Sequence, residues 1–370
     1  MSRQLTLFFG NALLDLTVPV TAEEEKHLVQ RFGLVPHVGQ EKDTIQNELM
    51  AFVSETRSDS TSYAPGGCAL NSSRMMAWLC QREALDVTTV FIGTRGAMDR
   101  STQKLLSLVQ NDGVDILMAE RLNLPTGHCI NLVQSVERTM VANLGAASHF
   151  NLSDLQELGV ESKLKMTQLV YMEGFFAIHS LDAFKAIIHL CCQRARIKFC
   201  FNLCGEYVCR SFEFVKEVTY ALSEMDILYG NMSEFETFLK TASTLDNPNI
   251  EALKCGLKGG QYIQSAEERS DRTKGRLESS HICTVIITNG SNPVISFLLD
   301  TTASRVFEFL SVRVPKVPRN EIKDTVGAGD CFVAGYLFAM LLNRSRLQCI
   351  EKGIEASHLV LKQSGTSLPN

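Results

Sequence analysis

The chain has 370 residues, of which 45% are hydrophobic and 21% are charged, and its formal net charge is −5 at pH 7. This composition gives enough apolar side chains for a large core, so it excludes a disordered or fibrous protein. The 36 basic residues form no long run and no stripe interleaved with aromatic side chains, which argues against a nucleic-acid partner.

The sequence also argues against a membrane partner and against secretion. The uncharged, mostly apolar stretch 331–342 is well short of the ~20 residues that a membrane span needs. Asn11 and Asp15 interrupt the apolar N-terminus, and no small-residue cleavage site follows. The twelve cysteines are scattered through apolar segments, as free thiols of a reducing compartment are. We therefore expect a cytoplasmic location, with the nucleus as a further possibility.

A cluster of cysteines raises the question of a zinc site. They form no C-x-x-C pair, and no histidine stands at ligand spacing, so we interpret them as buried thiols. The cluster comprises Cys191, Cys192, Cys200, Cys204 and Cys209.

Short runs of β-branched and aromatic residues alternate with longer amphipathic stretches along almost the whole chain. The runs begin near residues 5, 88, 168, 197, 225 and 283. They are almost continuously apolar, which is typical of strands buried on both faces. The alternation predicts an α/β fold with a doubly wound, mostly parallel sheet flanked by helices.

Two regions, 16–65 and 121–144, break this alternation. In the second region, HCINLVQ and RTMVANL are expected to pair as a hairpin. In the first, Thr21 and Glu24 have capping-box spacing and Gly33 marks a helix end, and a further helix is expected to start near Asp43 or Thr44. We predict that these regions form a small subdomain beside a core of residues 1–15, 66–120 and 145–370.

Polar and small residues follow several of the predicted strands. In an open parallel sheet the ligand lies beyond the carboxyl ends of the strands, so these residues are candidates for a binding site. They are Asn11 with Asp15, Gly66 with Gly67, Phe175, Asn202, Asn231 with Glu234, and Thr288 with Asn289 and Gly290.

The most informative stretch is DTVGAGD at 324–330, which leads into an apolar run of helical length. Gly327, Ala328 and Gly329 would let an anion approach the N–H groups at the start of that helix. Asp330 in the same first turn could act as a general base, or it could only cap the helix. The small residues favour the general base. The sequence G-x-x-x-x-G-K-[ST] is absent, so this is not a P-loop enzyme.

The DTVGAGD segment resembles the C-terminal signature of ribokinase-like sugar and nucleoside kinases. The resemblance implies that Asp330 deprotonates the acceptor hydroxyl while Gly327, Ala328 and Gly329 hold the migrating phosphoryl group. APGGCALNSSRMMAWL, from Ala64, is similar to part of the N-terminal signature of that superfamily. It implies substrate-binding roles for four residues: Gly66, Gly67, Cys68 and Asn71.

YGNMSEFETF at 229 resembles the N-x-x-E motif of the same superfamily. The resemblance implies that Asn231 and Glu234 position hydrated Mg²⁺ beside the phosphates of ATP. Taken alone, the motif could also be a helix cap followed by a solvated carboxylate. Further ATP contacts are expected from Thr288, Gly290 and Thr325, close to the C-terminal helix at about 346–363.

Several more segments, from FGNALLDL to the closing SGTSLP, look like adenosine kinases in particular, and the resemblance runs from end to end. It implies that Asn11 and Asp15 bind the ribose of adenosine, that the ring of Phe175 stacks on adenine, and that Arg138 reaches the phosphates. It also implies that the regions 16–65 and 121–144 form a lid. It places Cys129, Met140, Ala142 and Tyr207 around the adenine base or at the interface between lid and core.

Three departures from the adenosine kinase pattern leave alternatives open. Cys68 replaces a serine, either Gly39 or Gln40 stands where a polar base contact is frequent, and Arg100 to Thr102 break a D-x-x-G segment after Asp99. The chain could phosphorylate another nucleoside or a sugar. It could also be a paralogue that binds adenosine without turnover. We expect a monomer with no obligate protein partner.

Overall fold

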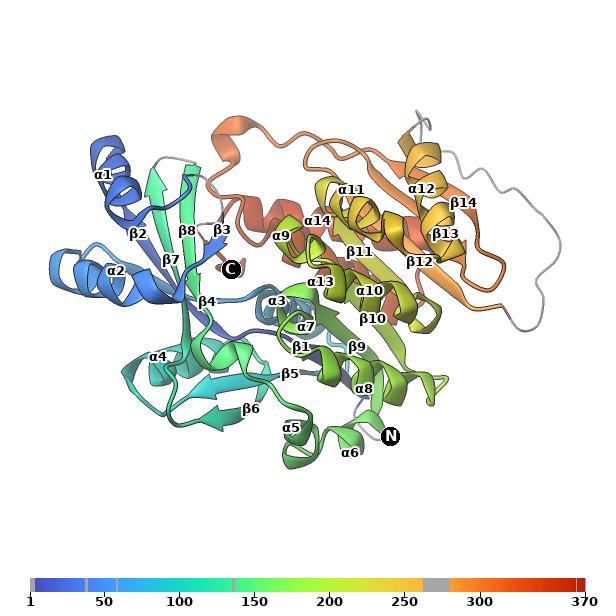
Figure 1. The fold of residues 1–370 in the computed structure, drawn as a ribbon, viewed down its shortest axis with the longest axis horizontal. Helices are drawn as coiled ribbons and strands as arrows, with labels where there is room; N and C mark the ends of the chain where they lie inside the picture. Colours follow the sequence, from blue (N-terminus) through green and yellow to red (C-terminus); the bar gives the residue numbers. More distant parts are fainter. Residues whose placement is uncertain are drawn as a thin grey trace.

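The computed structural model describes residues 4–36, 39–57, 59–134, 137–261, 280–363 and 365–369. Figure 1 shows two sheets, a large one that runs through the centre of the molecule and a small one at one end of it. The C-terminus lies where the two sheets meet (Figure 1). The site described below lies at this junction.

The large sheet has nine strands in the order β14-β13-β12-β11-β10-β9-β1-β5-β6. The pairs from β6 to β12 are parallel, and the pairs β12–β13 and β13–β14 at one edge are antiparallel. The mostly parallel, doubly wound sheet predicted from the sequence is therefore confirmed. The strands are β1 (Gln4–Phe9), β5 (Val87–Gly96), β6 (Asp115–Arg121), β9 (Thr167–Glu173), β10 (Lys198–Asn202), β11 (Ile227–Asn231), β12 (Ile282–Thr288), β13 (Val294–Asp300) and β14 (Arg305–Val312).

Alternate residues of the central strands enter two separate cores. Phe8, Tyr171 and Tyr229 pack on one face of the sheet, and Phe9, Met172 and Leu228 on the other. The first face is covered by α3 (Cys68–Arg82), α4 (Arg100–Gln110), α13 (Ala328–Leu341) and α14 (Arg346–Leu361). The other is covered by α5 (Leu152–Glu157), α6 (Val160–Leu164), α7 (Gly174–Ala177), α8 (Leu181–Cys192), α9 (Glu206–Cys209), α10 (Phe212–Ala221), α11 (Met232–Thr241) and α12 (Pro248–Gln261).

The small sheet has the order β3-β8-β7-β2-β4, and α1 (Ala22–Phe32) and α2 (Asp43–Thr56) lie beside it (Figure 1). Its strands are β2 (Leu13–Pro19), β3 (Gly39–Glu41), β4 (Ser62–Gly66), β7 (Gly127–Gln134) and β8 (Glu137–Asn143). The antiparallel β7–β8 hairpin, the capping box of Thr21 with Glu24 and the left-handed Gly33 at the end of α1 are all as predicted.

The division into a core and a lid stays a prediction. Strand β2 (Leu13–Pro19) belongs to the small sheet, but its first residues lie before the predicted boundary between core and lid, which falls after residue 15. Within the described residues, every helix falls short of the length and hydropathy that a membrane span requires.

The strand order reverses beside β1. The strands that follow β1 in sequence, β5 and β6, lie on one side of it, and β9 to β12 lie on the other. Such a switch point leaves a crevice at the carboxyl ends of the two neighbouring strands. Asn11 follows β1 and Glu173 ends β9, so both residues lie at this crevice, which is the expected position of a binding site.

Helix α13 is fixed against α14 by close approach at glycines. A Cβ added to Gly335 would lie 2.5 Å from the carbonyl oxygen of Lys352 and 2.8 Å from Cβ of Ala356. On the same helix, a Cβ added to Gly329 would meet no atom within 4 Å. The packing therefore requires glycine at 335 but not at 329.

We expect Gly335→Ala to lower the free energy of unfolding by about 1–3 kcal/mol, because the added methyl group overlaps main-chain atoms that cannot rotate away. Gly329→Ala is the matched control and should leave that free energy unchanged or slightly higher. Urea denaturation of both variants measures the difference. Equal effects of the two substitutions would contradict this account of the helix packing.

Candidate active site

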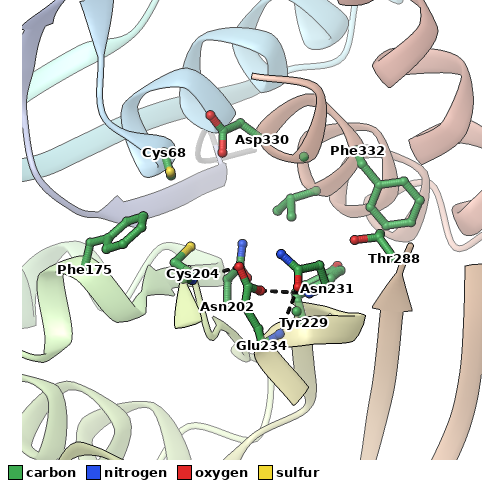
Figure 2. Close-up of a pocket in the computed structure, with 14 residues that line it drawn as sticks. Cys68, Phe175, Asn202, Cys204, Tyr229, Asn231, Glu234, Thr288, Asp330 and Phe332 are labelled. Atoms are coloured by element: carbon green, nitrogen blue, oxygen red, sulfur yellow. Dashed lines mark hydrogen bonds between the residues drawn. The ribbon is translucent and has the colours of Figure 1, made fainter. Parts of the chain in front are cut away.

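Two adjoining cavities lie between the carboxyl ends of the large sheet and the small sheet. The larger has a volume of about 1060 Å³ and the smaller about 180 Å³. Both are lined by Cys68, Phe175, Glu234 and Asp330, so they form one continuous site. Figure 2 shows Asp330 on one wall of the smaller cavity and Asn231 and Glu234 on the opposite wall.

Most of the residues predicted from the sequence meet in these cavities. Four do not line them: Gly66 packs behind Asp15, Ala328 is the first residue of α13, and Asn289 and Gly290 follow β12. The residues that do are Asn11, Asp15, Gly67, Cys68, Asn71, Cys129, Arg138, Met140, Ala142, Phe175, Asn202, Tyr207, Asn231, Glu234, Thr288, Thr325, Gly327, Gly329 and Asp330.

The double glycine lets the turn before α3 pack directly on Asn11 and Asp15. A Cβ added to Gly66 would lie 1.9 Å from a carboxylate oxygen of Asp15, and one added to Gly67 would lie 1.9 Å from the carbonyl oxygen of Asn11. Gly67 also has φ of 98°, in the region that favours glycine. Glycine is thus required at both positions, because any side chain there would overlap Asp15 or the main chain of Asn11.

The start of α13 opens onto the cavities. Gly327 precedes the helix with φ of 74°, and Gly329 faces open space. The N–H groups of a first helical turn have no partner within the helix, and the helix dipole places partial positive charge there. The N-terminus of α13 can therefore bind an anionic group.

Asp330 is 9% exposed and is held in position by residues of α3. The side-chain amide of Asn71 donates to its carboxylate at 3.0 Å, and the Ser72 hydroxyl donates to its carbonyl oxygen at 3.1 Å. Burial raises the pKa of Asp330 to about 6, although the hydrogen bonds from Asn71 and Cys68 lower it. A carboxylate with this pKa can take up a proton near neutral pH.

Arg74 orients Asn71. The guanidinium of Arg74 is buried and forms an ion pair with Asp112 at 2.6 Å. It also donates to the carbonyl oxygen of Thr366 at 3.0 Å and lies 3.4 Å from the Asn71 side-chain oxygen. This contact fixes which end of the Asn71 amide faces Asp330.

Glu173 lies under the site and is completely buried. Its carboxyl group accepts from the backbone N–H of Asn11 at 3.2 Å and of Ala69 at 2.9 Å. Burial raises the pKa of Glu173 to about 8, and the charge of Asp330 contributes to the shift. Glu173 thus joins the ends of β1 and β9 to the start of α3.

Asp15 lies in the larger cavity, on the side of the small sheet. Burial raises its pKa to about 7, and the charge of Asp330 raises it further, while Arg74 and Arg138 lower it. Asp15 is therefore a strong hydrogen-bond acceptor for hydroxyl groups when it is ionised.

Asn231 and Glu234 form a capping box at the start of α11. Glu234 accepts from the backbone N–H of Asn231 and of Gly205, both at 2.8 Å. Burial raises the pKa of Glu234 above its usual value. The capping role considered in the sequence analysis is thus present, and the same two residues also line both cavities.

Two polar contacts join the small sheet to the core across the larger cavity. Arg138 of β8 forms an ion pair with Asp324, which precedes α13, and the Tyr207 hydroxyl donates to Glu41 of β3. Although burial acts to raise the pKa of Asp324, Arg138 and the N–H groups of Val326 and Gly365 hold it below its usual value. The Arg138 guanidinium is thus engaged by Asp324 beside the anion-binding helix start.

Phe175 and Tyr207 form an aromatic wall. Their ring centroids are 5.6 Å apart with an interplanar angle of 23°, and both rings line the larger cavity. Such a wall suits a flat aromatic ligand.

A family model described as the pfkB family carbohydrate kinase matches residues 37–370. This match covers most of the chain, including Asn231, Glu234 and Asp330. The chain belongs to the pfkB family of carbohydrate kinases.

Relatives within this family include adenosine kinases. The chain is 26% identical over 371 residues to an adenosine kinase of Dictyostelium discoideum, covering 100% of this chain and 98% of that protein. A structure of Anopheles gambiae adenosine kinase in complex with a di(adenosine-5) tetraphosphate has 25% identity and a TM-score of 0.76, covering 99% and 97% of the two chains. Schistosoma mansoni adenosine kinase in complex with 2-fluoroadenosine has the same fold, with 23% identity, a TM-score of 0.77 and coverage of 100% and 98%. The ribokinase-like fold expected from the sequence is thereby confirmed.

Several residues in and around this pfkB-family site were not predicted from the sequence, among them Arg74, Glu173, Cys204 and Asp324. Arg74 and Asp324 lie inside the two recognised signatures, but their partners, Asp112 and Arg138, are far away in sequence. Glu173 directly precedes the predicted Phe175 segment, and its position at a strand end could have singled it out. Cys204 was assigned to a cluster of neighbouring cysteines, whereas its contact is with Cys68.

We expect Glu173→Gln to change how stability depends on pH. The unfolded chain loses the Glu173 proton near pH 4.5, whereas the folded protein holds it up to about pH 8, so ionisation opposes folding. As the pH rises from about 5 to 8, the free energy of unfolding of Glu173→Gln should gain at least about 1.4 kcal/mol relative to wild type. Glu83→Gln, at an exposed position, is the control, and a difference between Glu173→Gln and wild type that is independent of pH would refute the burial argument.

Proposed function

We propose that this protein transfers the γ-phosphoryl group of ATP to the 5′-hydroxyl of adenosine, giving AMP. One observation carries the proposal: a buried carboxylate, Asp330, stands in the first turn of a helix whose glycine-rich start opens onto the cavity. A base and an anion-binding helix terminus are thus side by side, as phosphoryl transfer to a hydroxyl requires. The end-to-end similarity to adenosine kinases supports adenosine as the acceptor.

Asp330 takes the proton of the acceptor hydroxyl in this mechanism. The Asn71 amide points one donor at the carboxylate, so the remaining lone pairs are available to the substrate. Because the pKa is about 6, the carboxylate is largely ionised at neutral pH and still basic enough to accept the proton.

The start of α13 stabilises the charge on the transferred group. Gly329 and Asp330 line the cavity at the first turn of the helix, and the absent side chain at 329 lets phosphate oxygens approach the N–H groups there. Thr325 and Thr288, which line the larger and the smaller cavity, are our candidates for further contacts with ATP. Gly290, after β12, would lie on the side of its adenine.

The nucleoside occupies the larger cavity. Asp15 accepts from the ribose hydroxyls, and the adenine ring stacks on Phe175, with Cys129, Met140 and Ala142 around it. The side-chain oxygen of Asn11 is buried and has no hydrogen-bond partner within the described residues, so it can accept from a substrate hydroxyl. A cavity of about 1060 Å³ is at the upper end of the range for small-molecule sites.

The wall opposite Asp330 fits Mg²⁺. Asn231 and Glu234 carry oxygen donors, which hard cations prefer, and both line the cavity between Asp330 and Thr288. Since the Glu234 oxygens already accept backbone N–H groups, these residues would hold the ion through water. When bound, Mg²⁺ neutralises charge on the phosphates of ATP.

The small sheet acts as a lid in this proposal. Its contacts with the core through Arg138–Asp324 and Tyr207–Glu41 keep it over the larger cavity and exclude water that would otherwise hydrolyse ATP. With ATP bound and the lid closed, Arg138 would exchange Asp324 for the phosphates, which lie beside the start of α13.

We propose that the protein works as a cytoplasmic monomer without an obligate protein or nucleic-acid partner. All twelve cysteines, each of which lies in the described part of the chain, are free thiols, in keeping with a reducing compartment. The net charge of −5 disfavours binding to nucleic acid.

The test of the reaction is AMP formation from adenosine, ATP and Mg²⁺ by wild type and Asp330→Ala. The substitution should lower kcat by about 10²–10⁴-fold or more, because the base is lost.

In wild type, kcat/KM should rise with pH through about 6 to 7, where Asp330 and Asp15 ionise, and then level off. A panel of nucleosides and hexoses under the same conditions tests the acceptor, and preference for a sugar would overturn adenosine.

If wild type forms no AMP while adenosine still raises its melting temperature, the protein is a binder without turnover. The absence of both effects would refute the assignment of the substrate.

Gly329→Ala separates the anion-binding role from stability. The added methyl group meets no protein atom, so folding should be intact, but it narrows the approach to the helix N–H groups. We expect kcat to fall by up to about 10²-fold, the cost of a displacement of about 1 Å in the reacting groups. Unchanged kcat and KM for ATP would show that the phosphates do not approach the helix at this residue.

A further inference from the structure

Three side chains from separate parts of the chain meet at the boundary of the two cavities. Cys68 is the first residue of α3, Glu173 is the last residue of β9, and Cys204 follows β10. One ligand atom from each lies within 4.8 Å of the other two. Figure 2 shows the sulfur atoms of Cys68 and Cys204 turned toward each other, below Asp330.

We propose that Cys68, Glu173 and Cys204 bind a soft divalent cation such as Zn²⁺, at a site separate from the proposed Mg²⁺ position. Two thiolates and a carboxylate are a donor set that Zn²⁺ accepts and that Mg²⁺ does not favour. A fourth position faces the cavity and can hold water, since Cys68 and Glu173 both line it.

The spacing of the donors fits a tetrahedral ion. Zinc–sulfur bonds of about 2.3 Å place two sulfur atoms about 3.8 Å apart in a tetrahedral site. Because the three donor atoms already lie within 4.8 Å of one another, small side-chain rotations bring them to bonding distance.

The backbone fixes where the donors stand. Cys204 has φ of 48°, in the left-handed region that side chains other than glycine rarely adopt, and Gly205 follows with φ of 108°. Two backbone N–H groups hold the carboxyl of Glu173, and Cys68 directly follows the tight turn at Gly67. Binding a cation therefore requires little ordering of the protein.

The surroundings of the cluster suit a cation. Asp330 lines the same two cavities as Cys68, so a second carboxyl group stands beside the three donors. Binding a divalent cation displaces the two thiol protons, together with that of Glu173 where it is bound.

Occupation of this site would interfere with phosphoryl transfer. Cys68 and Asp330 line the same two cavities, and the larger one also holds Asp15, so a bound cation changes the surroundings of the base and narrows the nucleoside space. Adenosine and the cation should therefore exclude each other. This consequence rests on the proposed function, whereas binding of the cation does not.

The test is a titration of the full-length, chelator-treated protein with Co²⁺, a spectroscopic substitute for Zn²⁺, without nucleotide or adenosine. We expect a near-ultraviolet thiolate-to-cobalt charge-transfer band that saturates at one equivalent per chain and disappears when Zn²⁺ is added. Cys68→Ser and Cys204→Ser should each lose the band. Cys255→Ser, at an exposed position on α12, is the matched control and should keep it.

Absence of the band in wild type, its persistence in both Cys68→Ser and Cys204→Ser, or its loss in Cys255→Ser would overturn the proposal. Circular dichroism and thermal melting identify any variant that fails to fold. In that case protection of Cys68 and Cys204 from alkylation by Zn²⁺ in wild type, read by peptide mass spectrometry, decides the question. None of these readouts depends on kinase activity, so failure of the cation site and failure of the proposed reaction can be told apart.

Discussion

The site depends on the burial of acidic groups at the carboxyl ends of parallel strands. Asp15, Glu173, Glu234 and Asp330 lie around the same cavities, and burial raises the pKa of each. Most of the compensation comes from fixed donors rather than cations: the Asn71 amide for Asp330 and backbone N–H groups for Glu173 and Glu234. Burial makes the ionised form of Asp330 energetically costly, and this raises its pKa enough for the carboxylate to accept a proton near neutral pH.

These donors are available because the two sheets meet at glycines. Gly66 and Gly67 let the turn before α3 lie directly on Asp15 and Asn11, which places Asn71 against Asp330 one turn into the helix. The pairing of Arg138 with Asp324 then links the small sheet to the segment that leads into α13. The small sheet and the start of α13 are thus joined by a direct contact.

The site combines the features expected of a pfkB-family kinase with a separate cluster of two thiols and a carboxyl group. The helix start at Gly327 to Asp330 and the capping box at Asn231 are the parts to which we assign phosphoryl transfer. Beside them, Cys68, Glu173 and Cys204 bring together two thiols and a carboxyl group, which transfer to a hydroxyl does not itself require.

The sequence by itself determined the parallel sheet, the β7–β8 hairpin, the helix caps at Thr21 and Gly33 and the identity of many cavity residues, because these depend on local periodicity, turn chemistry and contiguous motifs. Only the tertiary structure decided that Gly290 and Ala328 do not line the cavities, that Arg138 pairs with Asp324, and that Cys204 faces Cys68 rather than its sequence neighbours. The burial of Glu173 and the pKa of Asp330 were equally hidden. Both depend on charges and hydrogen-bond donors from strands and helices that are far apart in the sequence, and a local sequence pattern does not predict such contacts.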